Sequence, residues 1–533
     1  MLVPESAIFV EPLPSQVTGV DFLGLAAVNE RLAALAFPGI SNVTRYMRAY
    51  SVMSWMTWRF AKYFKEEANK KPISEKELAL RFLQFREKIE LLFTLGNPDR
   101  TQIAGQTRRD FLPDGRKSFS LRFSEFGNYK VSWLDAAVYG PSLGTENGLG
   151  FLERAPAQSY RPSDLGEELA LALDQSLRKS PHYESLADIH QTNGTNEMIR
   201  DLGRRWAVRE SNAKERACFR KAFFPEQAGK EGTSLPANRA AMIRLVLRTI
   251  RELRGRATVE AVRQTIARGV TRSGKALDLT DCLLTQGMWS VLQIRQLQRL
   301  AHEALLRWVE IMLLHSAPAL KGRTPADLAN LAADQVSEYL GIARSSPVQH
   351  VINRLNARKG EVDYYLAGLT NPNLDPFSTI DEIQSLRDLE TDAACLPGAA
   401  LNALALCSRQ AEFLQTREHQ ARWIGLGGSG RLSLQTLVRI FSTYESERLD
   451  VFVHFLIEAC VVGQHFAVTN AKLEPNKNKY RFISNDEGLR LLIKPSQLTG
   501  LNVTGDRLQN AMELMADCGL LDQDENGITF SLP

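Results

Sequence analysis

The feature that most constrains this chain is a helical periodicity of apolar residues along most of its length. Stretches rich in Leu, Ala, Arg and Glu repeat their apolar positions about every 3.6 residues, which is typical of helices packed on one face. These stretches predict helices over 75–93, 165–177, 238–253 and 288–314. Alternating apolar patterns are few and short, at 118–123, 480–483, 520–521 and 528–532. Because no strand–helix rhythm is present, we expect a mostly α, multidomain protein: helical bundles with small winged-helix-like β elements.

The length of the chain and its softer joints suggest a domain plan. At about 150 residues per domain, 533 residues correspond to three or four domains. Gly, Pro, Asn and Asp cluster near 96–115, 225–236 and 371–377. We expect a helical domain at 1–115, a winged-helix-like module at 116–180, a central helical domain at 181–420 with a basic segment at 200–275, and a C-terminal helical segment at 421–533 ending in a winged-helix-like module.

The cysteines and the apolar runs indicate the compartment. The six cysteines are scattered with no CxxC pair, which argues against zinc sites and a disulfide framework. Residues 1–16 lack the cationic and apolar regions of a signal peptide. The longest apolar candidate, 451–462, contains His454 and Glu458 and is shorter than the roughly 18 residues of a membrane span. We therefore expect a cytoplasmic protein without a membrane segment.

The C-terminus has the element order of the second half of a winged helix. Thr504 is a candidate N-cap for a helix with an apolar stripe, and a short helix over 495–501 is expected before it. A strand starting at Leu520, the turn Asn526-Gly527 and a return strand through Phe530 would then form a hairpin. The sequence thus predicts a recognition-type helix followed by a wing.

The charge of this C-terminal module argues against DNA binding. Between 504 and 530 there are six acidic residues and the single base Arg507, so the net charge is −5. A recognition helix and wing that contact phosphates normally carry Lys and Arg. We therefore expect the module to dock a protein partner, with a winged-helix transcriptional regulator as the alternative.

A second winged-helix-like module is expected over 130–177. A helix is predicted at 133–139, followed by a glycine-rich turn at 140–148. Ser163 is a candidate N-cap for the helix that follows. An irregular helical hairpin is the alternative for this segment.

The modest total charge conceals an uneven distribution. The chain has 65 Lys and Arg against 61 Asp and Glu, a net charge of +4. Residues 200–275 alone contain nineteen bases and seven acids, so this segment carries +12 and the rest of the chain −8. Fifteen of the nineteen bases are Arg, whose planar guanidinium suits bidentate contact with phosphate. The segment is therefore the predicted nucleic-acid-binding region, with DNA favoured.

Several arginines of this segment share one face of a predicted helix. At about 100° per residue, the four arginines between 244 and 254 fall within an arc of roughly 120° beside an apolar face. The candidate nucleic-acid-binding residues are Arg204, Arg205, Arg244, Arg248, Arg251, Arg254 and Arg263. The nearby aromatic residues Trp206, Phe219, Phe223 and Phe224 are candidates for base stacking. Two alternatives stay open: an acidic protein partner and a plain solvated face.

Motifs that would assign an enzymatic activity are incomplete. Gly425, Gly427 and Gly430 match GxGxxG, but a helical pattern precedes them where a dinucleotide site needs a strand. His454 and Glu458 share a helix face without a third or fourth metal ligand at a recognisable spacing. We assign no catalytic residue, cofactor or metal, and a nuclease with a dispersed active site is an alternative.

An aromatic segment and a second patch carry a resemblance to a known group of proteins. The run Phe37-Pro38-Gly39-Ile40-Ser41-Asn42-Val43-Thr44-Arg45-Tyr46, with Arg48-Ala49-Tyr50-Ser51 and Trp55, resembles the N-terminal signature of large bacterial proteins encoded in multi-gene antiphage defence loci. Residues 463–472, beginning Gly463-Gln464-His465, together with Arg481-Phe482, are similar to their C-terminal part. The resemblance implies an auxiliary subunit that works beside an ATPase, helicase or nuclease.

Together these patterns predict a non-catalytic subunit of a bacterial antiphage defence complex. Its basic segment would bind nucleic acid, and its acidic C-terminal module would dock other proteins of the complex. The dense aromatic and Met content of 37–64 indicates a core helix, in which Arg45 and Arg48 need partners if they too are enclosed. A pure protein scaffold is the remaining alternative.

Overall fold

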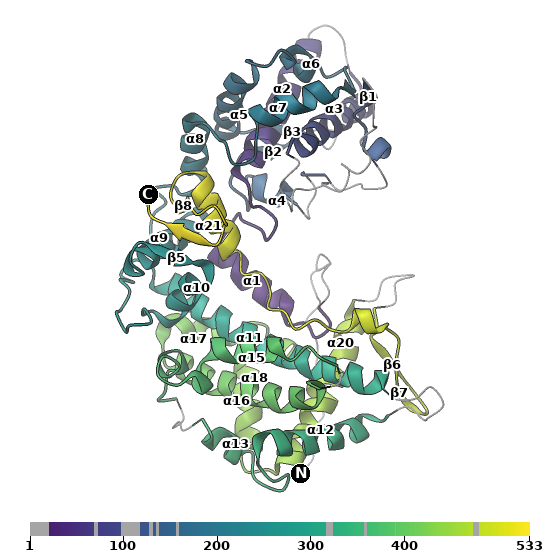
Figure 1. The fold of residues 1–533 in the computed structure, drawn as a ribbon, viewed down its shortest axis with the longest axis vertical. Helices are drawn as coiled ribbons and strands as arrows, with labels where there is room; N and C mark the ends of the chain where they lie inside the picture. The colour runs from purple at the N-terminus through teal and green to yellow at the C-terminus, as the bar shows by residue number, and fades with distance from the viewer. Residues whose placement is uncertain are drawn as a thin grey trace. The chain divides into compact units, whose positions relative to one another are not determined.

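The chain is mostly α-helical, with short strands in small sheets (Figure 1). The structure is a computed structural model. It describes residues 21–68, 73–97, 118–126, 132–134, 138–155, 159–315, 323–355, 360–389, 391–472 and 479–533. The predicted mostly α, multidomain fold is confirmed.

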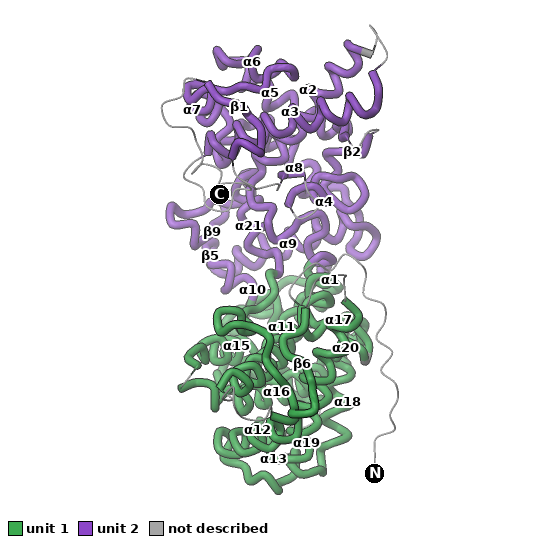
Figure 2. The backbone as a smooth tube through the Cα atoms, turned by 90° about the vertical axis from the view of Figure 1, so that its right-hand side faces the viewer, with its two compact units in different colours: residues 1–33, 264–279, 283–505 green, residues 34–263, 280–282, 506–533 purple. Residues whose placement is uncertain are grey.

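Two compact units divide the chain (Figure 2). Unit 1 consists of Met1–Ala33, Gln264–Leu279 and Leu283–Gly505, and unit 2 of Ala34–Arg263, Thr280–Cys282 and Asp506–Pro533. Helices α1 (Ala26–Ala36) and α10 (Val259–Arg268) each contain a boundary between these segments. Both units thus combine segments that are distant in sequence, whereas the four predicted domains are consecutive and stay a prediction.

Unit 1 is built around helix α11 (Leu283–Leu314), which is buried along nearly its whole length and packs against α16 (Leu396–Gln415). The other helices of unit 1 are α12 (Pro325–Leu340), α13 (Gln349–Asn353), α14 (Tyr364–Ala367), α15 (Pro376–Ser385), α17 (Glu418–Ile424), α18 (Leu434–Tyr444), α19 (Leu449–Phe455) and α20 (Gln464–Ala471). Its shorter elements are the hairpin β6 (Phe482–Asn485) and β7 (Gly488–Leu491), the 3-10 turns η3 (Pro372–Leu374), η4 (Ala393–Cys395), η5 (Ser429–Arg431) and η7 (Pro495–Gln497), and the π-helix η6 (Leu456–Gly463). The predicted helix over 288–314 is confirmed.

Buried polar side chains of α11 bond the backbone of irregular segments. Gln298 donates to the carbonyl of Leu432 at 2.6 Å, and Gln296 both donates to the carbonyl and accepts from the N–H of Thr504. Buried backbone groups outside regular elements need such partners, because they lack helix or sheet hydrogen bonds. The segment after η7 is therefore extended along α11, and the predicted helix over 495–501 is wrong beyond the three residues of η7.

Unit 2 packs α2 (Met47–Ala68) against α5 (Asp164–Leu177) and α3 (Glu75–Gly96) against α7 (Asn196–Arg205). Unit 2 also contains α4 (Gly140–Leu143), α6 (Tyr183–Ala187), α8 (Ala213–Phe223) and α9 (Leu235–Glu252), with the 3-10 turn η2 (Phe123–Phe126). The predicted helices over 75–93, 165–177 and 238–253 are confirmed as α3, α5 and α9.

Helix α2 is the core helix expected from the aromatic segment. Tyr50 and Trp55 are fully buried, and Trp55 donates its indole N–H to Asp174 at 2.8 Å. Arg48 is buried as well, and its guanidinium lies 3.2 Å from the buried carboxylate of Glu215. The expectation that Arg48 needs a partner if it is enclosed is therefore confirmed.

A hairpin stands immediately before α5. Strand β2 (Leu152–Arg154) pairs antiparallel with β3 (Tyr160–Pro162), and Ser163 caps α5 by accepting from the N–H of Gly166, as predicted. A further pair joins β1 (Phe119–Ser120) to β4 (Asn193–Gly194). This strand–strand–helix order differs from a winged helix, in which the hairpin follows the helix. The predicted helix at 133–139 lies partly outside the described residues, and its described ends are turns.

A three-stranded sheet joins the middle of the chain to its C-terminus. Strand β5 (Arg256–Thr258) pairs antiparallel with β9 (Thr529–Ser531), which pairs with β8 (Asp522–Gln523), so the order is β5–β9–β8. Helices α9 and α10 flank β5 in sequence, and α21 (Leu508–Asp517) precedes β8 (Figure 1). This is the element order of a winged helix, with residues 269–505 inserted between its second and third helices. The predicted C-terminal helix and hairpin are confirmed, but the first strand is Asp522–Gln523, because Leu520 and Leu521 lie in the bend after α21.

Replacing Gly166 by Ala tests the packing of the hairpin on α5. A Cβ at this position would lie 2.0 Å from the backbone oxygen of Phe151, so α5 or the hairpin must move. We expect Gly166→Ala to lower the free energy of unfolding by about 2 kcal/mol or more, measured by denaturant titration. The matched control is Gly144→Ala, where the nearest heavy atom would be 3.7 Å away. Equal stability of the two variants would contradict this packing.

Candidate nucleic-acid interface

The seven predicted arginines lie on three helices of unit 2 and one turn. Arg204 and Arg205 end α7, and Arg263 lies on α10. Arg244, Arg248 and Arg251 lie on α9, and Arg254 lies in the turn after it. The structure separates these residues into arginines held by carboxylates and arginines that are exposed.

Two arginines of α9 share one acidic partner. The Oδ2 of Asp281 lies 2.9 Å from Nε of Arg244, and its Oδ1 accepts from Nη1 of Arg248. The hydrogen bond from Arg248 is the main reason that the pKa of Asp281 lies below its ordinary value, and the charges of both arginines add to it. Both guanidiniums are about three-quarters buried, so they stabilise the contact of α9 with Asp281 and present little surface to a ligand.

Arg263 is held by an acidic residue from the C-terminal segment. Its Nε lies 2.6 Å from Oδ2 of Asp506, and Nη1 also pairs with Glu260. Burial alone lowers the pKa of Arg263, but the carboxylates of Asp506 and Glu260 outweigh burial and raise it. Asp506 also accepts from the N–H of Leu508 at the start of α21. Arg263 therefore fixes the beginning of α21 and is not free for phosphate.

The two arginines at the end of α7 differ in exposure. Arg205 pairs with Asp201 at 3.1 Å and is three-quarters buried. Arg204 is 81% exposed, and its distance of 3.8 Å to the same carboxylate makes only a weak ion pair. Arg200, one turn earlier, is exposed and donates to the carbonyl of Asn196. Arg204 and Arg200 can therefore reach a ligand.

Arg251 and Arg254 are exposed at the C-terminal end of α9. No hydrogen bond or ion pair of either side chain to the described part of the chain is found. Of the seven candidates, the structure thus leaves Arg204, Arg251 and Arg254 accessible. The sequence analysis did not include Arg200 among the candidates. Its spacing of four residues from Arg204 places both on one face of a helix, and this signal could have identified it.

Several other bases of the segment hold unit 2 together. The buried Arg239 donates to the carbonyls of Phe223, Ala222 and Pro38, and burial lowers its pKa to about 10. Arg220 donates to the carbonyl of Cys518 at 2.6 Å. Many of the positive side chains that give this segment its charge of +12 therefore form contacts within unit 2.

The prediction that four aromatic residues stack on bases is wrong for three of them. Trp206, Phe219 and Phe223 are fully buried, because their rings pack against other rings of the core. Only Phe224 is partly exposed. Contact through these residues would require unit 2 to open, so stacking of bases is not supported.

The recognition-type helix α21 is covered. Most of its residues are buried. The carboxylate of Asp517 accepts from the N–H of Met47 at 3.0 Å, so a residue near the C-terminus caps the start of α2. Burial raises the pKa of Asp517 to about 7. The helix begins at Leu508, so the predicted N-cap Thr504 is wrong: Thr504 bonds Gln296 of unit 1. A helix enclosed in this way cannot lie in a DNA groove.

The wing between β8 and β9 is acidic and ordered. Asp524 accepts from the N–H groups of Ile528 and Thr529, and Thr529 donates its hydroxyl to the same carboxylate. Asp522 and Glu525 are exposed beside it. Such a surface repels phosphate and suits a protein partner with basic side chains.

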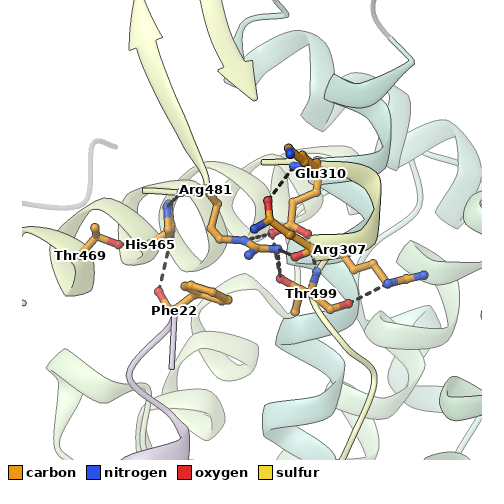
Figure 3. Close-up of polar contacts among 9 residues, drawn as sticks. Phe22, Arg307, Glu310, His465, Thr469, Arg481 and Thr499 are labelled. Carbon is orange, nitrogen blue, oxygen red and sulfur yellow. Dashed lines mark hydrogen bonds and ion pairs between the residues drawn. The ribbon is translucent and has the colours of Figure 1, made fainter. Parts of the chain in front are cut away.

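The second of the two sequence patches, with His465 and Arg481, falls on packing residues in unit 1 (Figure 3). Nε of Arg481 lies 2.7 Å from Glu310, which also accepts from the N–H and the hydroxyl of Thr499. The guanidinium of Arg481 lies over the ring of Phe22 at 4.3 Å. Nδ1 of His465 donates to the carbonyl of Phe22, while its Nε2 accepts from the N–H of Arg481. This pattern fits a neutral imidazole and a structural role.

Other motifs of the sequence do not assemble a catalytic or metal site. The GxGxxG glycines follow helix α17, so the strand that a dinucleotide site needs is missing there. His454 bonds Asn330, and His465 belongs to the cluster of Figure 3. Within the described ranges, no group of three or more His, Cys, Asp or Glu could hold a metal ion.

One helical stretch is long and apolar enough to cross a membrane by length and composition. It spans Leu449–Ala471, with a mean hydropathy of 1.7 over its best window. Because 56% of that window is buried inside the protein, this single stretch is weak evidence for a membrane span.

The division of the arginines can be tested by stability. We expect Arg263→Ala to lower the free energy of unfolding by about 2 kcal/mol, because it leaves the buried carboxylate of Asp506 without its partner. Arg204→Ala should change it by less than about 0.5 kcal/mol, since an exposed pair contributes little. Urea denaturation of both variants measures the difference. Similar losses would show that this separation into held and exposed arginines is wrong.

The buried His465 predicts a pH dependence of stability. Burial is the main reason that its pKa is lowered to about 4, and the charge of Arg481 adds to it. At His465 the unfolded chain takes up a proton near pH 6.5 and the folded protein does not, so the contribution of His465 to stability should fall as the pH decreases from about 6.5 to 4. His465→Gln should flatten this fall, measured by urea denaturation at several pH values. The exposed His350→Gln is the control, and identical slopes for His465→Gln and wild type would contradict the assignment.

Comparisons with family models, curated proteins and solved structures find no match for this chain. The resemblance to proteins of antiphage defence loci therefore stays a prediction based on the two sequence patches.

Proposed function

We propose that this chain is a cytoplasmic, non-catalytic subunit of a bacterial antiphage defence complex that binds nucleic acid and docks other proteins. The observation that carries the nucleic-acid part is the set of exposed arginines Arg200, Arg204, Arg251 and Arg254 on one compact unit. They remain accessible after the other predicted arginines are assigned to carboxylates. Exposed arginines of this kind contact phosphates by charge and by bidentate hydrogen bonds.

The proposed contact is with the nucleic-acid backbone and not with the bases. Direct readout requires an element that enters a groove or an exposed aromatic surface. Helix α21 is enclosed, and Trp206, Phe219 and Phe223 are buried. This supports a sequence-independent role over a transcriptional regulator.

The protein-docking part is supported by the acidic wing. Its carboxylates at Asp522, Asp524 and Glu525 would repel phosphate, but they complement a basic protein surface. The partners we propose are other proteins of the complex, such as an ATPase, a helicase or a nuclease. A pure scaffold is the second candidate, favoured if no nucleic acid binds.

Charge reversal of the exposed arginines tests the nucleic-acid part. We expect Arg200→Glu, Arg204→Glu and Arg251→Glu together to weaken binding of a short DNA duplex by at least about 10-fold at low salt, and to reduce the salt dependence, because phosphate contacts are lost. Fluorescence anisotropy with DNA and with RNA of the same sequence measures both effects and separates the two polymers.

The matched control is Arg154→Glu with Arg161→Glu, two exposed arginines of unit 2 outside the basic segment. This control should bind DNA within about twofold of a wild-type protein, apart from the general effect of net charge. Equal loss in both variants would indicate that only net charge matters. If the wild type binds no DNA or RNA at low salt, the nucleic-acid part of the proposal is wrong and the pure protein scaffold is favoured.

A further inference from the structure

Helix α9 ends in a turn that normally requires glycine. The N–H of Gly255 donates to the carbonyl of Ile250 at 2.9 Å, and the N–H of Arg254 donates to Arg251 at 3.2 Å. These two bonds define a Schellman motif, in which the residue at the position of Arg254 is left-handed and is usually Gly. Arg254 has φ +66° at this position. The neighbouring glycine, Gly255, comes one residue after it and so does not remove the strain at Arg254.

The described chain contains two other non-glycine residues with positive φ, and both have structural roles. Arg507, with φ +68°, donates its guanidinium to the carbonyl of Ile40. Leu432, with φ +45°, is buried and its carbonyl accepts from Gln298. Arg254 is exposed, and its side chain has no partner among the described residues. The fold therefore gains no visible contact from an arginine at this strained position.

The helix end does not require this charge either. Positive side chains near a helix C-terminus are favourable because the last carbonyls carry partial negative charge. Arg251 in the last turn and Arg256 in β5 already supply positive charge beside this end. Glycine at position 254 would relieve the unfavourable φ, and no hydrogen bond or ion pair of the side chain with the described residues would be lost.

Strained backbone that the fold does not need points to a function. Resting on the proposed function above, we infer that Arg254 is the anchor of the nucleic-acid contact and that it binds a backbone phosphodiester with its guanidinium. The turn holds Arg254 at the end of α9, three residues after Arg251 in sequence. An arginine fork can bind two phosphate oxygens together, which a lysine ammonium does less specifically. The site thus keeps an unfavourable residue because that residue contacts the ligand.

A separation of stability from binding tests this inference. We expect Arg254→Gly to raise the melting temperature by about 2 °C, because the strain is relieved. The same variant should weaken binding of a short DNA duplex by about 10-fold and reduce the slope of log affinity against log salt by about one. Arg254→Lys should keep the salt slope and recover only part of the affinity.

The matched control is Arg507→Gly, which relieves a similar φ but removes the bond to Ile40. It should not raise the melting temperature, and it should leave DNA affinity unchanged. If Arg254→Gly lowers the melting temperature, Arg254 is structural and the inference is wrong. If Arg254→Gly binds DNA as tightly as the wild type, while Arg200→Glu, Arg204→Glu and Arg251→Glu together weaken binding as expected, then Arg254 is not the anchor but the proposed function stands. If the wild type binds no DNA, the proposed function itself is overturned.

Discussion

The antiparallel pairing of β5 with β9 is the interaction on which the construction of unit 2 depends. It joins Arg256 to Ser531 and Ala257 to Phe530, so the last strand of the chain completes a sheet begun in its middle. Phe530 is buried on the inner face of this sheet. The entropy of closing a loop grows only with the logarithm of its length, so the long insertion costs little more than a short one. This pairing places α21 inside unit 2 and so determines which surfaces stay open.

The pairing also brings together the two charged regions that the sequence shows as separate. Arg263 contacts Asp506 and Arg256 lies 3.5 Å from Asp524, so acidic residues of the C-terminal segment neutralise bases of segment 200–275. The positive and negative segments are in part complementary halves of one unit. A surface for an external partner must therefore be sought among the residues that this internal pairing leaves exposed.

The sequence predicts what depends on local pattern and misses what depends on distant partners. Periodicity predicted α3, α5, α9 and α11, and a local hydroxyl predicted the cap Ser163, which the structure forms. The partner of Arg263 lies 243 residues away, so no spacing rule could reveal that this arginine is held. Thr504 is a residue type that often caps helices, but its backbone bonds to the distant Gln296, so it does not cap α21. The prediction that Trp206, Phe219 and Phe223 stack on bases was wrong for the same reason. Their proximity in sequence does not show that other parts of the chain bury their rings.

The number of arginines that we propose as phosphate contacts bears on what such a protein can do by itself. Each phosphate contact contributes about 0.9 to the slope of log affinity against log salt. Four contacts give a slope near 3.6, so a fourfold rise in salt weakens binding by roughly 100-fold. A protein that binds DNA through these residues alone would hold it poorly at physiological salt. Tethering to a partner that also binds DNA raises the local concentration and makes weak contacts effective. The charge arithmetic therefore favours a subunit whose acidic wing recruits it to a complex over a protein that binds DNA alone.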